Sequence, residues 1–191
     1  MLLSESLGVP LNSAQAQTFM DANPIMIEGG GYTASEISFK LACMRVLETL
    51  RDRFSVKRWR VVDESNDEGN RLVQASMSLS IGDSAMVTAT AEGAGPVDAL
   101  TRAMRRELEG WYPELASMRL GTFSVTAIDI SSHDSAAHVR VTVSFYADGY
   151  EPWITAGVSS DLNQAALMAI VDGFHYWLLQ CEKPSLVGSA A

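Results

Sequence analysis

Positively charged residues, histidine, cysteine and long apolar runs are all scarce in this sequence. Its 191 residues include 14 lysines and arginines against 23 aspartates and glutamates, a formal net charge of −9. A surface of that sign repels phosphate backbones and anionic lipids, so nucleic-acid and membrane partners are disfavoured. No apolar run approaches the roughly 18 residues of a membrane-spanning helix. The N-terminal segment MLLSESLGVP lacks the basic residues and apolar stretch of a signal peptide, so a cytoplasmic location is expected.

The few cysteines and histidines match no common metal or redox motif. Cys43 and Cys181 lie far apart and neither belongs to a C-x-x-C pair, so we expect two reduced thiols. His133, His138 and His175 show none of the spacings of metal-binding helices. The sequence therefore predicts no metal, no cofactor and no catalytic constellation.

Residues 1–50 have the apolar spacing of helices. The segment SAQAQTFMDA is expected to form a short helix beginning at Ser13, and Ser35 is a suitable N-cap for a longer one. The apolar stripe of that longer helix comprises Ile37, Leu41, Met44, Leu47 and Leu50. We expect residues 1–50 to be a helical linker or subdomain.

From Phe54 onward the apolar period changes to two, which is typical of half-buried antiparallel strands. A Gly82-Asp83 hairpin signal joins the segments VQASMSLSI and SAMVTATAE, and Pro96 then suits the first turn of a helix. The alternating apolar residues of the first segment are Val73, Ala75, Met77, Leu79 and Ile81. The stripe of the helix comprises Val97, Leu100, Met104, Leu108 and Trp111.

The same order of elements returns in the second half. The strands FSVTAIDI, HVRVTVSF and EPWITAGVSS precede the helix DLNQAALMAIVDGFHYWLL, for which Ser159-Ser160-Asp161 suits an N-cap better than a nucleophile. Hairpin signals at residues 82 and 148 are 66 apart, and helix starts at Gly95 and Ser160 are 65 apart.

This spacing predicts an α+β fold of two tandem βββα units, with antiparallel sheets and helices packed on one face. The expected organisation is a helical linker at 1–50, a duplicated domain at 51–182 with repeats at about 53–112 and 115–180, and a flexible tail at 183–191.

The stretch ATAEGAGPVDAL, residues 89–100, places two glycines where a strand turns into a helix. It lacks the Lys-Ser/Thr of a phosphate loop and the third glycine of a dinucleotide fingerprint. Small residues here let a ligand approach the backbone, and the N–H groups of a helix start favour a carboxylate. The same residues equally suit a tight turn without a ligand, so both interpretations remain open.

The motif G-x-G-P-x-x-A at 93–99, together with W-x-T-x-G-V-S at 153–159, carries a resemblance to a known family. The chain resembles the C-terminal regulatory domain of the 2-isopropylmalate synthase and citramalate synthase family, and the citramalate branch is the closer one. The segments FSVKRWRVVDE, WYPELASMRLGTFSVTAIDI and GGGYTASEISFKL also look like that branch. The resemblance covers roughly residues 30–180, and the catalytic barrel of the family has no counterpart here.

The resemblance implies a homodimer that binds leucine or isoleucine near its interface, in feedback regulation of an acyl-CoA-dependent condensing synthase, a transferase. Tyr32 would lie in the linker segment that contacts the active site of a partner. Leu120 and Phe123 would equally suit a hydrophobic core. The implied ligand-binding positions are Gly93, Gly95, Pro96, Val97, Ala99, Leu120, Phe123, Ser135, Ala137, Thr155, Gly157 and Ser159.

We hold three hypotheses on function. The first is a regulatory, dimerising domain without catalysis of its own, whose effector is a branched-chain amino acid. The second is an interaction module that dimerises or complements a separate synthase barrel through Tyr32 and the N-terminal helices. The third is a new enzyme that uses His133, His138 and Tyr32 as acid or base.

Overall fold

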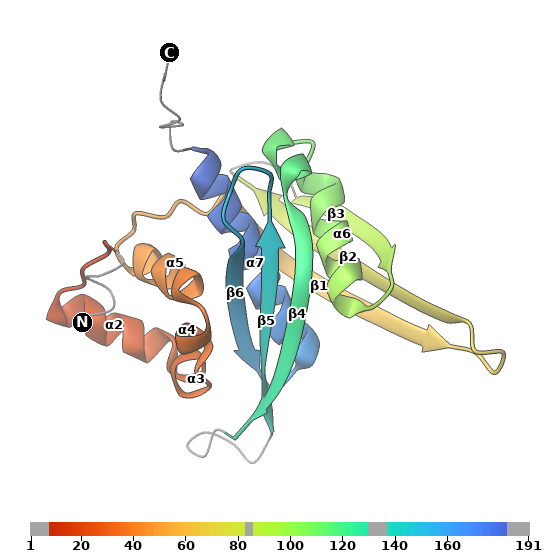
Figure 1. Ribbon diagram of the computed structural model, residues 1–191, viewed down its shortest axis with the longest axis horizontal. Coiled ribbons are helices and arrows are strands. Elements are labelled where there is room, and N and C mark those ends of the chain that lie inside the picture. The colour runs from red at the N-terminus through yellow and green to blue at the C-terminus, as the bar shows by residue number, and fades with distance from the viewer. Residues whose placement is uncertain (1–7, 83–85, 130–136, 183–191) are drawn as a thin grey trace.

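Two three-stranded antiparallel sheets, each with one long helix, follow a group of short N-terminal helices (Figure 1). The computed structural model describes residues 8–82, 86–129 and 137–182. The second sheet lies in front of its helix in Figure 1, and the first sheet lies behind its own, so the two helices lie on the facing sides of the sheets.

The first βββα unit confirms the period-two pattern. All five alternating apolar residues of the central strand are buried, and they face α6. Pro96 occupies the first helical position. Trp111 was wrongly assigned to the stripe, because α6 ends at Leu108 and the Trp111 side chain is exposed. The elements are β1 (Phe54–Ser65), β2 (Arg71–Ile81), β3 (Met86–Gly93) and α6 (Pro96–Leu108).

The second unit repeats the first with a helix that starts 66 residues later, at Leu162 instead of Pro96. Asp161 caps this helix, as expected of the Ser159-Ser160-Asp161 segment. Leu162, the first residue of the helix, is exposed, and His138, the first residue of the strand HVRVTVSF, is buried. The elements are η1 (Pro113–Ser117), β4 (Arg119–Ile128), β5 (His138–Tyr146), β6 (Trp153–Ser159) and α7 (Leu162–Cys181).

One hydrophobic core joins the two units. It contains Met77 and Leu79 of β2, Leu100 of α6, and Phe145 and Phe174 of the second unit. Helix α6 packs on the first sheet, α7 packs on β5 and β6, and the two helices contact each other. The duplicated units therefore fold against one another around a shared interior.

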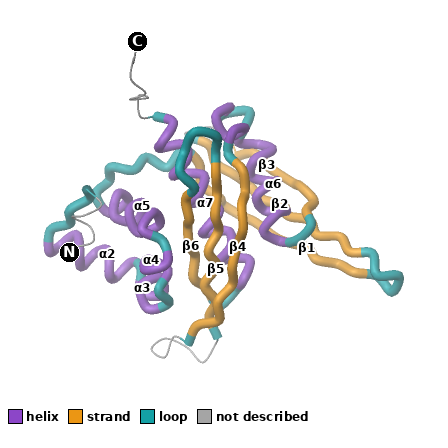
Figure 2. The backbone as a smooth tube through the Cα atoms, viewed as in Figure 1, coloured by secondary structure: helices purple, strands orange, loops and turns teal. Residues whose placement is uncertain are grey.

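The N-terminal helices pack on β6 through a second hydrophobic cluster that includes Phe19, Tyr32 and Val158 (Figure 2). Helix α5 begins after Ser35, whose hydroxyl accepts a hydrogen bond from the Ser38 N–H, as predicted. This helix ends at Val46, so Leu50 lies beyond its stripe. The elements are α2 (Ser13–Ala22), α3 (Pro24–Glu28), α4 (Gly31–Ala34) and α5 (Glu36–Val46).

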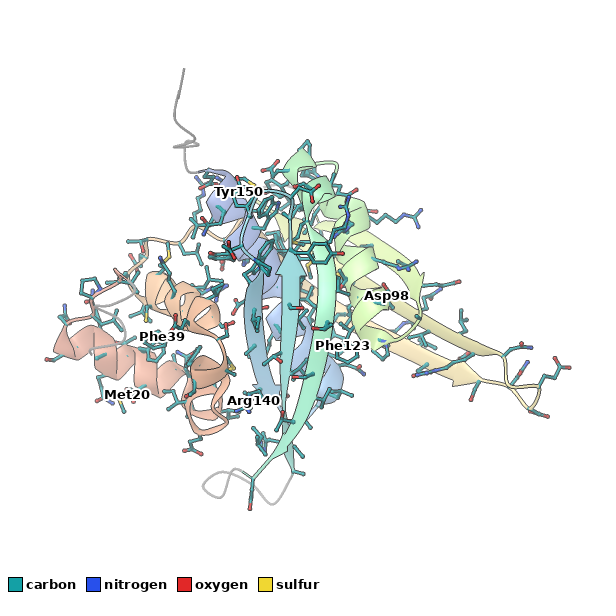
Figure 3. All side chains as sticks on the ribbon, viewed as in Figure 1. Met20, Phe39, Asp98, Phe123, Arg140 and Tyr150 are labelled. Carbon is teal, nitrogen blue, oxygen red and sulfur yellow. The ribbon has the colours of Figure 1, made fainter. Side chains whose placement is uncertain are left out.

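Two serines of this segment bind the free edge of β6. The Ser35 hydroxyl donates to the Ile154 carbonyl at 2.7 Å, and Ser38 Oγ accepts from the Ala156 N–H at 3.0 Å. Arg140 on β5 donates to the carbonyls of Gly29 and Gly30, at 3.1 and 3.3 Å (Figure 3). An edge strand presents unpaired backbone groups, and the Ser35 and Ser38 hydroxyls bind two of them on β6. The N-terminal helices are therefore joined to the second sheet by polar contacts as well as by apolar packing.

Candidate functional site

The start of α6 has no side-chain cap among the described residues. Gly95 is the N-cap residue, its backbone is extended, and a Cβ built on it would contact no atom within 4 Å. Asp98 is the nearby candidate cap, but its Oδ2 accepts from the Ala94 N–H at 2.9 Å and its Oδ1 from Arg102 Nε at 2.8 Å. Pro96 has no N–H and the Ala99 N–H donates to the Gly95 carbonyl, so the Val97 and Asp98 N–H groups are left without a side-chain cap from the described residues, at the positive end of the helix dipole.

The start of α7 differs in this respect. Asp161 Oδ1 accepts from the N–H groups of Asn163 and Gln164, at 2.7 and 3.0 Å, and Ser159 Oγ accepts from the Asp161 N–H at 3.1 Å. Thr155 is buried, and its hydroxyl donates to the Ala169 carbonyl at 2.6 Å. The side chains of Asp161, Ser159 and Thr155 thus have partners within the chain, whereas Asn163 Oδ1 in the first turn of α7 is buried without one among the described residues.

Gly93 and Gly157 are required by packing. A Cβ on Gly93 would overlap the backbone of Ala99, and a Cβ on Gly157 would overlap the carbonyl oxygen of Ala165. In both units, a strand therefore passes so close to the following helix that only glycine fits. This contact explains why both positions hold glycine without any reference to a ligand.

Strand β4 presents an uncovered apolar surface on the side of its sheet that faces the core. Phe123 is 54% exposed and Val125 is 45% exposed, whereas their β5 neighbours Val143 and Val141 are fully buried. The reason is that α7 covers β5 and β6, so the third strand of the sheet extends beyond it. Phe123 therefore does not belong to the hydrophobic core. Leu120, by contrast, is half-buried and packs against the core. Figure 3 labels Phe123 on β4 and Asp98 at the start of α6.

The remaining predicted site residues are dispersed. Val97 and Ala99 point into the core, Pro96 is half-buried, and Ala137 is exposed just before β5. Ser135 lies outside the described residues, as does the His133 of the enzyme hypothesis. The accessible part of the first helix start is thus Gly95 and Pro96.

Tyr32 is buried among aromatic side chains of the N-terminal helices. Its ring lies 5.2 Å from that of Phe19 and 5.6 Å from that of Phe39, and its hydroxyl donates to Asn23 Oδ1 at 2.6 Å. Burial raises the pKa of this hydroxyl above its usual value. In this structure Tyr32 stabilises the N-terminal cluster.

A buried polar cluster escaped the sequence analysis. Arg45 on α5 donates from Nη1 and Nη2 to Asp172 Oδ1 on α7, both at 3.0 Å, and its Nη2 lies 3.3 Å from His175 Nδ1. His175 Nε2 lies 3.1 Å from the Phe54 carbonyl. Since a carbonyl only accepts, Nε2 carries the proton and Nδ1 accepts from Arg45. Burial lowers the pKa of His175 to about 4. The residues of this cluster are far apart in sequence, so no local pattern indicated them.

The cluster forms part of the wall of a cavity of about 840 Å³ between the N-terminal helices, α7 and β1. Within the part of the chain that the structure describes, no group of three or more histidine, cysteine, aspartate or glutamate side chains is arranged to hold a metal ion. None of the described helices has the length and apolar character needed to cross a membrane.

Comparison with known proteins gives one family. The model of the LeuA allosteric (dimerisation) domain matches residues 34–178. An (R)-citramalate synthase of Geobacter sulfurreducens is 35% identical over 160 residues, which cover 82% of this chain and 30% of the relative. Those of Streptomyces coelicolor and Aquifex aeolicus are 34% and 32% identical over 155 and 161 residues, covering 81% and 84% of this chain and 28% and 30% of the relatives. The chain thus spans less than a third of the length of these relatives.

Proposed function

The chain belongs to the LeuA allosteric (dimerisation) domain family, and from this premise we propose that it is a homodimeric regulatory domain that binds a branched-chain amino acid. The effector is isoleucine or leucine, and the regulated activity is that of an acyl-CoA-dependent condensing synthase. The curated relatives carry the name (R)-citramalate synthase. In the proposal these 191 residues sense an end product and do not catalyse the condensation.

The observation that carries the proposal is the uncovered face of β4. Phe123 and Val125 continue the apolar surface that Val143 and Val141 form on the next strand, but no helix among the described residues covers them. Burying one such side chain contributes about 1.5–3 kcal/mol. A second copy of the chain that covers this face would therefore gain stability from a surface that the protomer leaves open.

The start of α6 supports binding of an amino-acid carboxylate. Among the described residues, the N–H groups of Val97 and Asp98 have no side-chain cap, and a Cβ on the N-cap residue Gly95 would contact nothing within 4 Å. The positive end of a helix stabilises an anion at this position. In the proposal the carboxylate lies there and the aliphatic side chain contacts Leu120 and Phe123, whereas Ala137 lies toward the opposite end of the sheet and takes no part.

The two helix starts are not equivalent in the proposal. At the start of α7, Asp161 already occupies the position that a carboxylate would take, and its own charge repels an anion. Thr155 and Ser159 also use their hydroxyls within the chain. We therefore place the effector at the first unit, with Gly157 acting through packing alone.

The test combines the molar mass of the purified chain in solution, from light scattering, with isothermal titration calorimetry against isoleucine, leucine and valine. We expect a dimer that binds one of them saturably. Phe123→Asp should give monomers and remove the binding, whereas Ile154→Asp, at a side chain that is 48% exposed on the opposite side of its sheet, should leave both unchanged. A dimer that binds none of the three at millimolar concentration would overturn the effector assignment and favour the interaction-module hypothesis.

A further inference from the structure

The cavity of about 840 Å³ lies well away from the start of α6 and joins two parts of the chain. Its walls come from α2 and α5 on one side, from β1 on the other, and from α7 between them. Its volume suits a small organic molecule. We call it the α5–β1 cavity. None of the residues expected to bind the effector lies in its wall.

Glu48 lines this cavity from an unusual backbone conformation. It follows the last turn of α5 with φ +54°, and the Thr49 N–H donates to the Met44 carbonyl at 2.9 Å. This is the left-handed position at which helices usually end with glycine, because any side chain is strained there. The chain instead carries a carboxylate at this position, on the rim of the cavity.

Lys57 lines the same cavity from a second backbone irregularity. The pairing of β1 with β2 skips one residue between Val56 and Arg58, which makes Lys57 the additional residue of a β-bulge. Bulges change the direction of a side chain and are frequent beside binding sites. The cavity wall therefore carries the exposed Glu48 carboxylate and the exposed Lys57 ammonium group, in addition to the Asp52 carboxylate that pairs with Arg45.

The rest of the wall combines polar side chains, such as Thr18 and Gln164, with apolar ones. Trp59 of β1 and Met168 and Val171 of α7 are half-buried and line the cavity. The Arg45 guanidinium already contacts Asp172, His175 and Asp52 through four N–H groups, so these groups are not available to a ligand. These residues therefore form a rigid part of the wall, and Glu48 and Lys57 are the charged groups left for a ligand.

We propose that the α5–β1 cavity binds a free α-amino acid with a large apolar side chain, as a site independent of the α6 start. Lys57 pairs with the carboxylate of the ligand, Glu48 pairs with its ammonium group, and its side chain packs on Trp59 and Met168. Such a ligand touches α5, β1 and α7 together, so its binding strengthens the attachment of the N-terminal helices to the rest of the fold.

The experiment is a titration of the whole chain with phenylalanine, methionine and leucine, followed by calorimetry and by the ring signals of Trp59 in NMR spectra. N-acetylated and amidated derivatives of the tightest ligand report on each charge separately. We expect both derivatives to bind at least about tenfold more weakly, since each loses one ion pair. Equal affinity of the derivatives, or no saturable binding that moves the Trp59 signals, would overturn the proposal.

Glu48→Gly is the decisive variant, because it removes the carboxylate while it relieves the backbone strain. Weaker binding therefore cannot come from unfolding, and the thermal midpoint without ligand should rise. Lys57→Ala should also weaken binding, whereas Lys40→Ala, which lies outside the cavity, should not. Phe123→Asp separates the two proposals: if it removes all binding and Glu48→Gly removes none, the cavity proposal is wrong and the α6 site stands.

Discussion

Arg45 and Asp172, 127 residues apart, are joined by two hydrogen bonds of 3.0 Å to a single carboxylate oxygen. This ion pair connects the N-terminal helices with the helix of the second unit. The Asp172 side chain is mostly buried, with 14% of its surface exposed, while Arg45 keeps about a third of its surface in water. The pair therefore contributes to the attachment of α5, and substituting either residue tests that contribution.

Asp172→Ala should lower the free energy of unfolding by about 2 kcal/mol, since it leaves the Arg45 guanidinium without its main partner in a mostly buried site. Denaturant unfolding followed by circular dichroism measures the change. Asp63→Ala is the matched control, because the Asp63–Arg71 pair is exposed to solvent and exposed pairs contribute little. Equal effects of the two substitutions would contradict the structural role of the buried pair.

Stability should fall as the pH decreases from about 6.5 to about 4 because of His175. Burial, with a smaller effect of Arg45, lowers the pKa of the folded state to about 4 from 6.5 in the unfolded chain, against the opposing influence of Asp52. The unfolded state then binds more protons over this interval, so the contribution is fully present above the unfolded pKa and declines by up to about 3 kcal/mol.

His175→Gln tests this assignment, because it removes the titrating group and keeps a polar side chain. Its unfolding free energy should depend less steeply on pH than that of the unchanged chain between about 6.5 and 4. The comparison uses the slope, so a general loss of stability in the variant does not affect it. Parallel pH profiles would contradict the prediction.

Gly95→Ser should raise stability by a few tenths of a kcal/mol, because serine caps the open start of α6. The same hydroxyl occupies the N–H groups proposed for the effector, so the affinity for isoleucine or leucine should fall about tenfold. Thermal unfolding and calorimetry measure the two effects. Gly110→Ser, in the turn after α6, is the control for both. A variant that binds the effector as tightly as before would place the carboxylate elsewhere.

Gly157→Ala should destabilise the chain by about 1–3 kcal/mol, since the added methyl group overlaps the Ala165 carbonyl and pushes α7 away from β6. Gly110→Ala, whose Cβ would contact only the Glu107 carbonyl at 3.7 Å, should have a much smaller effect. Chemical denaturation of both variants gives the comparison. If the Gly157→Ala variant unfolded with the same free energy as the unchanged chain, β6 and α7 would be able to separate without cost.

The local elements could be predicted because their signals lie within a few residues of one another. The alternation from Val73 to Ile81 identifies a half-buried strand, Pro96 begins a helix, and Ser35 and Asp161 cap two others. The spacing of the two units also predicts the duplication, because the same order of strands and helix recurs after 65 or 66 residues in the sequence, and the helices of the structure start 66 residues apart.

The errors and omissions concern contacts between distant segments. Trp111 and Leu162 continue an apolar pattern but are exposed, because no other element in the described part of the chain covers them. Phe123 suits a core strand by composition, and only the position of α7 over the other two strands leaves it uncovered.

The sequence by itself determined the α+β class, the tandem βββα order, the helix caps and the family, since these depend on periodicity, short motifs and overall similarity. Only the tertiary structure decided that Gly157 must be glycine, that Arg45 meets Asp172, and that Glu48 and Lys57 line one cavity. The physical reason is that close approaches, ion pairs and cavities arise where separately formed elements pack, and their geometry is not encoded in any local stretch of residues.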